Sequence, residues 1–361
     1  MALGISVYPG LENSAAENLS LIRRAARLGI KRLFTSLHIP ETEKNGFAEE
    51  LRGLLAEAKA AGMDVIADAA PETPALLGLT NLDPEALASL GIRTLRLDDG
   101  FSPEEIAALT KERGAMRYQL NASTLDEAFL ARLLRGEPEL SRLDALHNFY
   151  PRENTGLSLR ALLEKTRRLR GLGISVGAFV ATRDGRKRAP IGSGLPTLEL
   201  HRGLSVDLAA RHLAALGLDD IFIGDALPTE GELASLASTQ LHCVTLRAAA
   251  ETESPSLRVL FAEPFTARPD EARDAVRAAE GRARAKKIGC PLLPENTAAR
   301  PFGAVTLDNE KYLRYAGELQ IVKRPLPEDP RVNVVAHIRP EERFLIPCIR
   351  PGGAFRLLLD E

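Results

Sequence analysis

The sequence has no marked excess of charge of either sign and no cysteine pattern. Its 361 residues include 47 Lys and Arg against 49 Asp and Glu, a net charge of -2 at pH 7. This near neutrality argues against a nucleic-acid or membrane-surface role that depends on bulk charge. The cysteines Cys243, Cys290 and Cys348 are far apart and form no C-x-x-C pair. We therefore expect neither a disulfide framework nor a zinc site.

Long apolar runs and export signals are also missing. No stretch approaches the roughly 18 apolar residues that a membrane span requires. The opening residues MALGISVYPG lack the basic segment that begins a secretion signal. These features favour a protein of the reducing cytoplasm, with no nucleic-acid partner and no membrane partner. The sequence is compatible with a homo-oligomer.

Motifs for metal, nucleotide and serine-nucleophile chemistry are absent as well. The sequence has no H-x-H, no H-E-x-x-H and no Asp/His cluster at metal-ligand spacing. The segment YPGLE (8–12) stands where a doubly wound sheet would carry a Gly-rich phosphate loop. There is also no G-x-S-x-G nucleophile motif. We expect no metal and no cofactor.

What the sequence does contain is a repeat. Strand-like runs alternate with amphipathic stretches of helical period at an average spacing of about 30 residues, the length of a βα unit. The runs are 3–8, 32–36, 64–68, 94–98, 117–121, 143–149, 175–180 and 220–224. Glycine ends five of the helical stretches, and capping-box patterns begin at Ser14, Ser102, Thr124 and Thr229. Eight such units close most economically as a (β/α)8 or TIM barrel, which we predict over residues 1–240.

A different pattern begins near residue 240. Strand-like runs are separated there by proline-rich turns, and one stretch, 270–286, is interpreted as an Arg-rich helix with a solvated face. The runs are 241–248, 257–263, 304–309, 317–324, 331–338 and 355–360. We predict a second, β-rich domain over residues 241–361.

Polar side chains follow most of the predicted barrel strands, at the end of the barrel where active sites are built. Strand alternation places Arg96 and Asp98 on one face. Inward carboxylates need partners that offset desolvation, which favours function for Asp68 and Asp98, whereas Asp99 and Asp225 resemble helix caps. The strand-end candidates are Ser6, Tyr8, Thr35, Ser36, His38, Asp68, Glu72, Asp98, Asp99, Asn121, His147, Asn148, Glu199, His201, Arg202 and Asp225.

Several carboxylates at a barrel mouth suit more than one chemistry. In glycoside hydrolysis, one carboxylic acid protonates the leaving oxygen and a second carboxylate acts as base or nucleophile. Proton abstraction from a sugar fits the same residues, and composition and spacing do not choose between the two. For His147 and His201, hydrogen bonding is favoured over metal ligation because no metal-ligand spacing accompanies them.

Motifs along nearly the whole chain resemble one family. They are LGISVYP, RLFTSL, VIADAAPE, IRTLRLDDGF, LHNFYPRENTGLS and LPTLELHR in the first part, and LDN-x-x-Y-x-R-Y-x-GELQI and RVNVVAHI in the second. Together they resemble the bacterial 6-phospho-N-acetylmuramidases. The resemblance implies a TIM barrel followed by a small cyclophilin-like β-barrel domain. It also implies cytoplasmic hydrolysis of 6-phospho-N-acetylmuramyl glycosides, such as the disaccharide with N-acetylglucosamine, in peptidoglycan recycling.

The family motifs, carried onto this sequence, make Asp68, Asp98 and Glu199 the catalytic candidates, with Asp98 and Glu199 as the pair. The second domain is expected to close over the site and to help hold the 6-phosphate. The resemblance implies a 6-phosphorylated amino-sugar glycoside as the partner molecule. Substrate-binding candidates are Ser6, Tyr8, Arg96, Asn121, His147, Asn148, Tyr150, Arg152, Thr155, His201, Arg202, Asn296, Thr297, Asp308, Tyr312, Glu318 and Gln320.

Two questions stay open at the level of the sequence. The first is the reaction, because a sugar-phosphate isomerase or epimerase on the same scaffold and a non-catalytic carbohydrate-binding protein are the alternatives to a glycosidase. The second is the basic segment with Arg183, Arg186, Lys187 and Arg188. A solvated loop is favoured for it over an anion-attracting lid.

Overall fold

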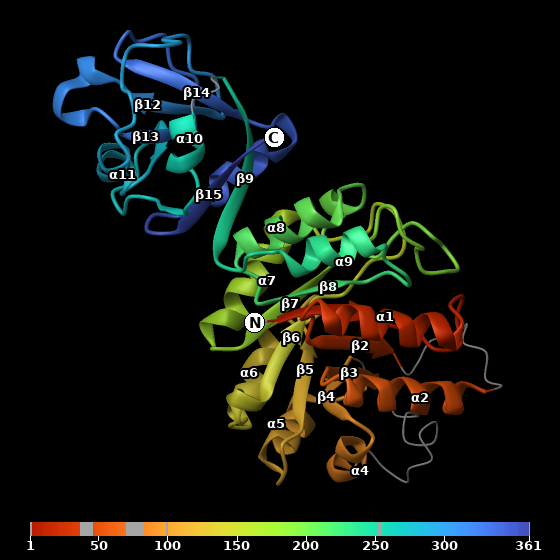
Figure 1. The fold of residues 1–361 in the computed structure, drawn as a ribbon. Helices are drawn as coiled ribbons and strands as arrows, with labels where there is room; N and C mark the ends of the chain where they lie inside the picture. The colour runs from red at the N-terminus through yellow and green to blue at the C-terminus, as the bar shows by residue number, and fades with distance from the viewer. Residues whose placement is uncertain (1, 37–45, 70–82, 99, 252–254, 361) are drawn as a thin grey trace. The chain divides into compact units, whose positions relative to one another are not determined.

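Eight parallel strands close into a barrel in the first part of the chain (Figure 1). The computed structural model describes residues 2–36, 46–69, 83–98, 100–251 and 255–360. β1 pairs with both β2 and β8, which closes the ring. The strands are β1 (Ala2–Ser6), β2 (Arg32–Ser36), β3 (Asp64–Ala69), β4 (Ile92–Leu97), β5 (Arg117–Asn121), β6 (Leu143–Leu146), β7 (Ser175–Val180) and β8 (Asp220–Ile223). The predicted TIM barrel is confirmed.

Helices follow the strands and lie outside them (Figure 1). The predicted capping boxes at Ser14, Ser102 and Thr229 are present, but the one at Thr124 is wrong. There the helix is capped by Asp126, whose side chain accepts from the Phe129 N–H at 2.7 Å. The helices are α1 (Ala15–Arg27), α2 (Phe47–Ala60), α4 (Pro84–Ser89), α5 (Pro103–Lys111), α6 (Glu127–Arg135), α7 (Leu159–Gly171), α8 (Val206–Leu216) and α9 (Glu230–Ala237), with short 3-10 turns η1 (Leu140–Arg142) and η2 (Glu199–His201).

A charged layer closes the N-terminal end of the barrel strands. Arg32 at the start of β2 pairs with Asp220 and lies 2.9 Å from an oxygen of Asp144. Gln119 donates to the other Asp144 oxygen at 2.8 Å, and the Ala2 N–H donates to Asp220 at 2.7 Å. All four side chains of this layer are buried, so internal donors take the place of water around its carboxylates.

The second compact unit comprises residues Ala214–Gly217 and Gln240–Glu361 and is built on a curled sheet. Its strand order is β10-β15-β9-β14-β12-β13-β11, with β15 and β9 parallel and the other pairs antiparallel. The strands are β9 (Cys243–Ala250), β10 (Phe265–Thr266), β11 (Ala275–Arg277), β12 (Ala304–Asp308), β13 (Leu319–Val322), β14 (Val332–Ile338) and β15 (Ala354–Leu359). The cyclophilin likeness and the division at residue 240 stay predictions.

Two sequence expectations for this unit are wrong. The predicted strand 257–263 is largely the helix α10 (Pro255–Leu260), which buries Leu257 and Leu260 three positions apart on one face. The predicted helix 270–286 contains the strand β11, and only α11 (Gly281–Lys287) is helical. β11 pairs with β13, a tertiary contact that outweighs the local helix preference of its Ala- and Arg-rich sequence. Further 3-10 segments are η3 (Glu310–Tyr315) and η4 (Pro340–Cys348).

The helices of the described residues are short or amphipathic. None of them combines the length with the apolar composition that crossing a lipid bilayer requires.

Candidate active site

The C-terminal ends of β3, β4 and β5 place a polar group at the mouth of the barrel. Asp68 on β3 stands beside Arg96 on β4 in the strand register, and Asp98 directly follows β4. Asn121 ends β5, and Asn148 comes two residues after β6. These five side chains, which we call the mouth cluster, were all predicted from the sequence, and the fold brings them together.

Arg96 is the centre of the mouth cluster. Its buried guanidinium donates from Nη2 to Asn148 Oδ1 at 2.6 Å, while Nη1 lies 3.6 Å from Asp68 Oδ2 and 3.5 Å from Asp98 Oδ2. Because Asp68 Oδ2 and Asp98 Oδ2 approach the same nitrogen, they are at most about 7 Å apart. Carboxyl groups are about 5–5.5 Å apart in retaining glycosidases and about 6.5–9.5 Å apart in inverting ones. The bound admits the retaining spacing and the short end of the inverting range. The two carboxylates thus lie close enough to act on one glycosidic bond.

The two aspartates of the cluster keep access to solvent. The Asp98 side chain is 36% exposed and that of Asp68 is 19% exposed, against 4% for Arg96. The Asn121 amide donates to Asp98 Oδ1, and its own oxygen accepts from the Ser123 N–H at 3.0 Å, which fixes the orientation of the amide. The carboxylates are therefore held in place from within the barrel and remain reachable from outside.

An aromatic cluster of Tyr8, Phe34, Phe149 and Phe179 lies next to the mouth cluster. Its rings meet edge to face at centroid distances of 5.1–6.4 Å. The Arg96 Cζ lies 6.0 Å from the Phe34 centroid. Tyr8 donates its hydroxyl to the Gly224 carbonyl at 2.6 Å, and burial raises the pKa of that hydroxyl well above its usual range. Tyr8 therefore stays protonated. Its ring packs in the aromatic cluster, and its hydroxyl links the segment after β1 to the residue after β8. Apolar rings with a few fixed polar groups are typical of small-molecule sites.

Glu199 has a different environment from the two aspartates. Its Oε1 accepts from the Asn154 N–H at 2.9 Å and from Arg202 at 2.6 Å, and its Oε2 accepts from the Gly156 N–H at 2.8 Å and from Arg202 at 2.7 Å. The Arg202 bond, helped by the two backbone donors, lowers the pKa of Glu199 to about 2. A carboxylate with four donors in place is a poor proton donor. We call this arrangement the Glu199 clamp.

The Glu199 clamp explains two of the family motifs in structural terms. Arg202 also donates to the carbonyls of Tyr150 and Arg152, so it ties the segment after β6 to η2. A Cβ on Gly156 would lie 2.6 Å from Glu199 Oε2, which is why the TGLS motif needs glycine there. The catalytic role that the sequence suggested for Glu199 stays a prediction, and these contacts favour a positioning role.

The two candidate histidines contact side chains other than those of the mouth cluster. His147 lies between the Ser123 hydroxyl at 3.1 Å and the Thr166 hydroxyl of α7 at 3.0 Å. His201 contacts His212 of α8 at 2.9 Å. Burial lowers the pKa of His147 and of His201 to about 3, so both are neutral. Their contacts agree with the hydrogen-bonding role favoured from the sequence. Within the described residues, no group of three or more His, Cys, Asp and Glu could hold a metal.

The other barrel candidates divide between the mouth and the surface. Ser6 is buried at the end of β1, and Ser36 lies 3.5 Å from Asp68. Thr155 donates only to the nearby Arg152 carbonyl, and both residues are exposed. His38, Glu72 and Asp99 lie outside the described residues. The sequence favours Asp225 as a helix cap, but this is wrong for α9, which Thr229 caps.

The candidates of the second unit make separate contacts within that unit. Burial and the neighbouring Glu318 carboxylate raise the pKa of Asp308 to about 7. Glu318 accepts from Arg277 at 2.6 Å and from Gln320 at 3.4 Å. Asn296 donates to the Val334 carbonyl, and the Tyr312 ring lies under Arg331. Thr297 follows Asn296 in the loop before β12. Their predicted role in holding phosphate stays a prediction.

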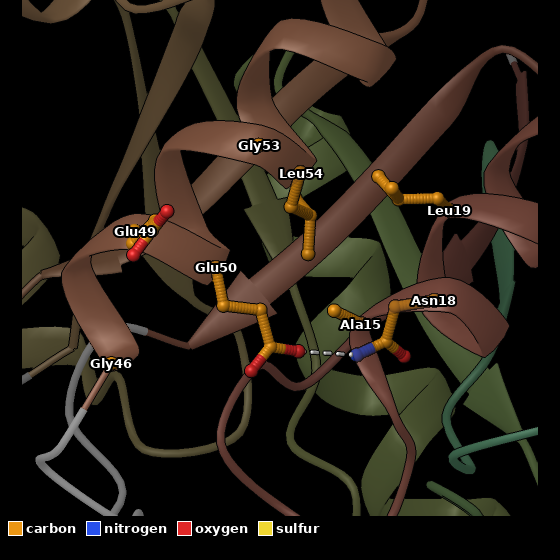
Figure 2. A pocket seen from close by; sticks show the side chains of 8 residues that line it. All are labelled: Ala15, Asn18, Leu19, Gly46, Glu49, Glu50, Gly53 and Leu54. Carbon is orange, nitrogen blue, oxygen red and sulfur yellow. Dashed lines mark hydrogen bonds between the residues drawn. The ribbon is translucent and has the colours of Figure 1, made fainter.

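A cavity on the outer side of the barrel contains none of the predicted site residues. It lies between α1 and α2, has a volume of about 340 Å³, and is crossed by the hydrogen bond from Asn18 to Glu50 (Figure 2). Glu50 also accepts from the Gly10 N–H at 3.0 Å. The carboxylate there fastens two helices to the first loop, so we place the candidate site at the barrel mouth.

Sequence reasoning missed one residue at the mouth, Arg188. The sequence favours a solvated loop for the basic segment that contains it, yet its guanidinium carbon lies 5.0 Å from the Tyr8 ring centroid and 4.9 Å from that of Phe149. A usable signal was the mixture of basic residues with glycine and proline in the long segment after β7, where barrel enzymes often bind phosphate.

Comparison with known proteins bears on this geometry. The family model "6-phospho-N-acetylmuramidase, N-terminal" matches residues 3–238, and "6-phospho-N-acetylmuramidase, C-terminal" matches residues 243–358. The chain belongs to the 6-phospho-N-acetylmuramidase family. The predicted resemblance is thereby confirmed, and the family name is that of a glycosidase.

Two solved structures are similar to this member of the 6-phospho-N-acetylmuramidase family over its full length. An uncharacterized protein from B. cereus is 31% identical, with a TM-score of 0.86 and 99% of each chain covered. A conserved protein from Enterococcus faecalis, described as having an unknown function, is 35% identical, with a TM-score of 0.71, covering 100% of this chain and 97% of its own. No curated protein is significantly similar to the chain.

Proposed function

We propose that the chain is a glycosidase that hydrolyses 6-phospho-N-acetylmuramyl glycosides, with Asp68 and Asp98 as its catalytic carboxyl groups. The observation that carries the proposal is their shared contact with Arg96: two partly exposed carboxylates approach one buried guanidinium nitrogen at 3.6 and 3.5 Å. Family membership supports a glycosidase over the isomerase and the non-catalytic alternatives.

The proposed mechanism divides two roles between the aspartates. One carboxyl group, protonated, gives its proton to the oxygen of the leaving sugar, and the other, ionised, attacks the anomeric carbon or activates water. Arg96 places one positive charge beside both carboxylates, with its Nη1 3.6 Å from Asp68 Oδ2 and 3.5 Å from Asp98 Oδ2. Asn121, fixed by the Ser123 N–H, orients Asp98 for this step.

Other parts of the proposal rest on the family resemblance alone. These are the cytoplasmic setting, the role in peptidoglycan recycling and the disaccharide with N-acetylglucosamine as the natural substrate. Glu199 is left out of the catalytic pair because its oxygens already accept four internal bonds.

The test is hydrolysis of a chromogenic aryl glycoside of 6-phospho-N-acetylmuramic acid by the full chain. We expect turnover by the wild type and a loss of about 10²- to 10⁴-fold in kcat for Asp68→Asn and for Asp98→Asn, the usual range for a positioned acid or base. Detecting the anomer first released by NMR would report retention or inversion, and hence whether the second aspartate is nucleophile or base.

Asp64→Asn is the matched control, because Asp64 lies on the same strand as Asp68 but is exposed at the other end of the barrel. Its kcat should equal that of the wild type. Thermal unfolding of all three variants should match the wild type within a few degrees. Near-normal kcat in either mouth variant would remove that aspartate from the mechanism, and no hydrolysis by the wild type would overturn the proposed function.

A further inference from the structure

Four basic residues lie close together in the segment between β7 and α8, and two of them are already neutralised. Arg183 pairs with the adjacent Asp184 at 3.1 Å. Arg186 pairs with Glu17 at 2.9 Å and donates to Asn13 at 2.8 Å. The positive charge of these two residues is therefore engaged at the protein surface.

Arg188 differs from these neighbours in what surrounds its charge. Its Cζ lies 5.0 Å from the Tyr8 centroid and 4.9 Å from the Phe149 centroid, so two rings hold the guanidinium. In the described part of the chain, it forms no ion pair, and its Nε is buried there without a hydrogen-bond partner. The two rings stand at 88° to each other, so the guanidinium lies over their edge-to-face pair, and it also acts on the Tyr8 hydroxyl, whose pKa it lowers against the effect of burial. A cation on aromatic faces keeps its charge available to an anion.

The backbone that carries Arg188 is fixed in place. The buried Asp225 carboxylate accepts from the N–H groups of Thr182, Arg188 and Leu195 at 2.9, 3.1 and 3.2 Å. Glu12 accepts from the next N–H, that of Ala189, at 3.1 Å. A guanidinium held by both its rings and its backbone needs little reordering when it binds an anion.

The position of Arg188 links it to the mouth cluster. Phe149, whose ring centroid lies 4.9 Å from the Arg188 Cζ, directly follows Asn148, the residue that accepts from Arg96. The Arg96 charge is shared with Asp68 and Asp98, whereas Arg188 has no carboxylate within ion-pair distance among the described residues. At the mouth, carboxylates therefore balance the charge of Arg96, whereas the charge of Arg188 has no such partner among the described residues.

We propose that Arg188 binds the phosphate group of the phosphorylated sugar substrate and so sets the preference for phosphorylated glycosides. This deepens the proposed function and rests on it for the identity of the substrate. A guanidinium fork matches the paired oxygens of a phosphate, and the loop after the seventh strand is a common phosphate-binding place in TIM barrels. A lactyl carboxylate of muramic acid has the same anionic oxygen chemistry, and the test separates the two.

The experiment measures binding by titration calorimetry, without turnover. The ligands are N-acetylglucosamine and N-acetylmuramic acid, each with and without a 6-phosphate. Wild type should bind each phosphorylated sugar more tightly than its plain form. Arg188→Gln should weaken both phosphorylated sugars about 10- to 100-fold, the range for hydrogen bonds to charged groups, and Arg188→Lys should lie between. Arg183→Gln, which removes one charge from the same segment, is the matched control and should bind as wild type.

Each other outcome overturns the inference. If Arg188→Gln weakens only the two muramic acid ligands, the arginine binds the lactyl carboxylate. If Arg188→Gln and Arg183→Gln weaken the binding of the phosphorylated sugars equally, or if neither weakens it, Arg188 has no specific role in binding phosphate. A wild type that binds plain and phosphorylated sugars alike contradicts it directly. Because no hydrolysis is needed, tight phosphate-dependent binding by a protein that fails to cleave the aryl glycoside would reject the proposed reaction and leave this inference standing.

Discussion

The barrel carries an arginine with two aspartates at each end, and the two groups differ in how closely their charges are matched. At the N-terminal ends of the strands, Arg32 lies 2.9 Å from Asp144. The side chains of Asp144 and Asp220 are 3% and 9% exposed. At the mouth, Arg96 contacts its two aspartates at 3.5 and 3.6 Å, and those carboxylates are 36% and 19% exposed.

The difference separates a structural use of these residue types from a chemical one. In the closed layer, Gln119 and the Ala2 N–H occupy the further oxygens of Asp144 and Asp220, so these carboxylates have internal donors on both oxygens. At the mouth the contacts are longer and the carboxylates reach solvent, so a substrate can compete for them. An inward arginine beside aspartates is therefore not a sign of catalysis until exposure and contact distance are known.

The largest expected effect on stability comes from breaking the closed layer. Arg32→Met leaves Asp144 and Asp220 buried without their cation, which costs about 3–5 kcal/mol in the free energy of unfolding. Arg96→Met should cost less than half of that, because water reaches its aspartates, while lowering kcat at least as much as loss of one aspartate. Urea unfolding and the aryl glycoside assay measure the two effects.

A combined variant guards against simple misfolding in that comparison. Arg32→Met with Asp144→Asn and Asp220→Asn removes the unpaired charges and should recover part of the lost stability, since neutral residues need no counter-charge. Equal destabilisation by Arg32→Met and Arg96→Met would show that the two ends are energetically alike and would break the contrast.

The Glu199 clamp predicts an intermediate effect with a characteristic pH dependence. Glu199→Gln removes charge-assisted bonds and should lower the free energy of unfolding at pH 7 by about 1–3 kcal/mol. The folded pKa of about 2 lies below the ordinary value of 4.5, so this stabilisation is present above pH 4.5 and is lost as the pH falls towards 2. The unfolding midpoints of the wild type and the variant should therefore converge as the pH falls from 4.5 towards 2.

A second variant distinguishes positioning from catalysis at the clamp. Gly156→Ala pushes a methyl group against Glu199 Oε2 without changing any charge, and should reproduce the stability loss. If Glu199→Gln instead abolishes kcat with unchanged unfolding, while Gly156→Ala retains activity, Glu199 is a catalytic group and the clamp interpretation is wrong.

The barrel was predictable from the sequence because its signals are local and repeated. Period, helix caps and glycine stops such as Gly29 and Gly91, both with positive φ, all indicate the same βα unit. The second unit was harder, because β11 exists only through its pairing with β13, and the segment 257–263 has the apolar content of a strand but the spacing of a helix. Pairing partners distant in sequence leave no local signal.

The candidate site was predictable in its residues but not in their roles. Asp68, Asp98, Asn121 and Asn148 were singled out because they stand at strand ends, and Arg96 because strand alternation places it on the same face as Asp98. The closed barrel brings the five together. Family motifs also pointed to Glu199, although a motif marks a required residue without saying whether it binds substrate or holds a loop. Arg188 was missed because the rings that it contacts come from the segments after β1 and β6, far away along the chain.

The smallest expected effect on stability comes from another arginine–aspartate pair on β3 and β4, the strands that carry Asp68 and Arg96. Arg93 on β4 and Asp64 on β3 are 3.5 Å apart, but their side chains are 73% and 54% exposed. An exposed pair gains little, about 0–1 kcal/mol, because water and salt screen it. Arg93→Gln with Asp64→Asn should shift the unfolding free energy by less than about 0.5 kcal/mol and leave kcat unchanged. A larger loss would mean that position along the strands, rather than exposure, sets the value of an arginine–aspartate contact in this barrel, and the contrast between its two ends would need another explanation.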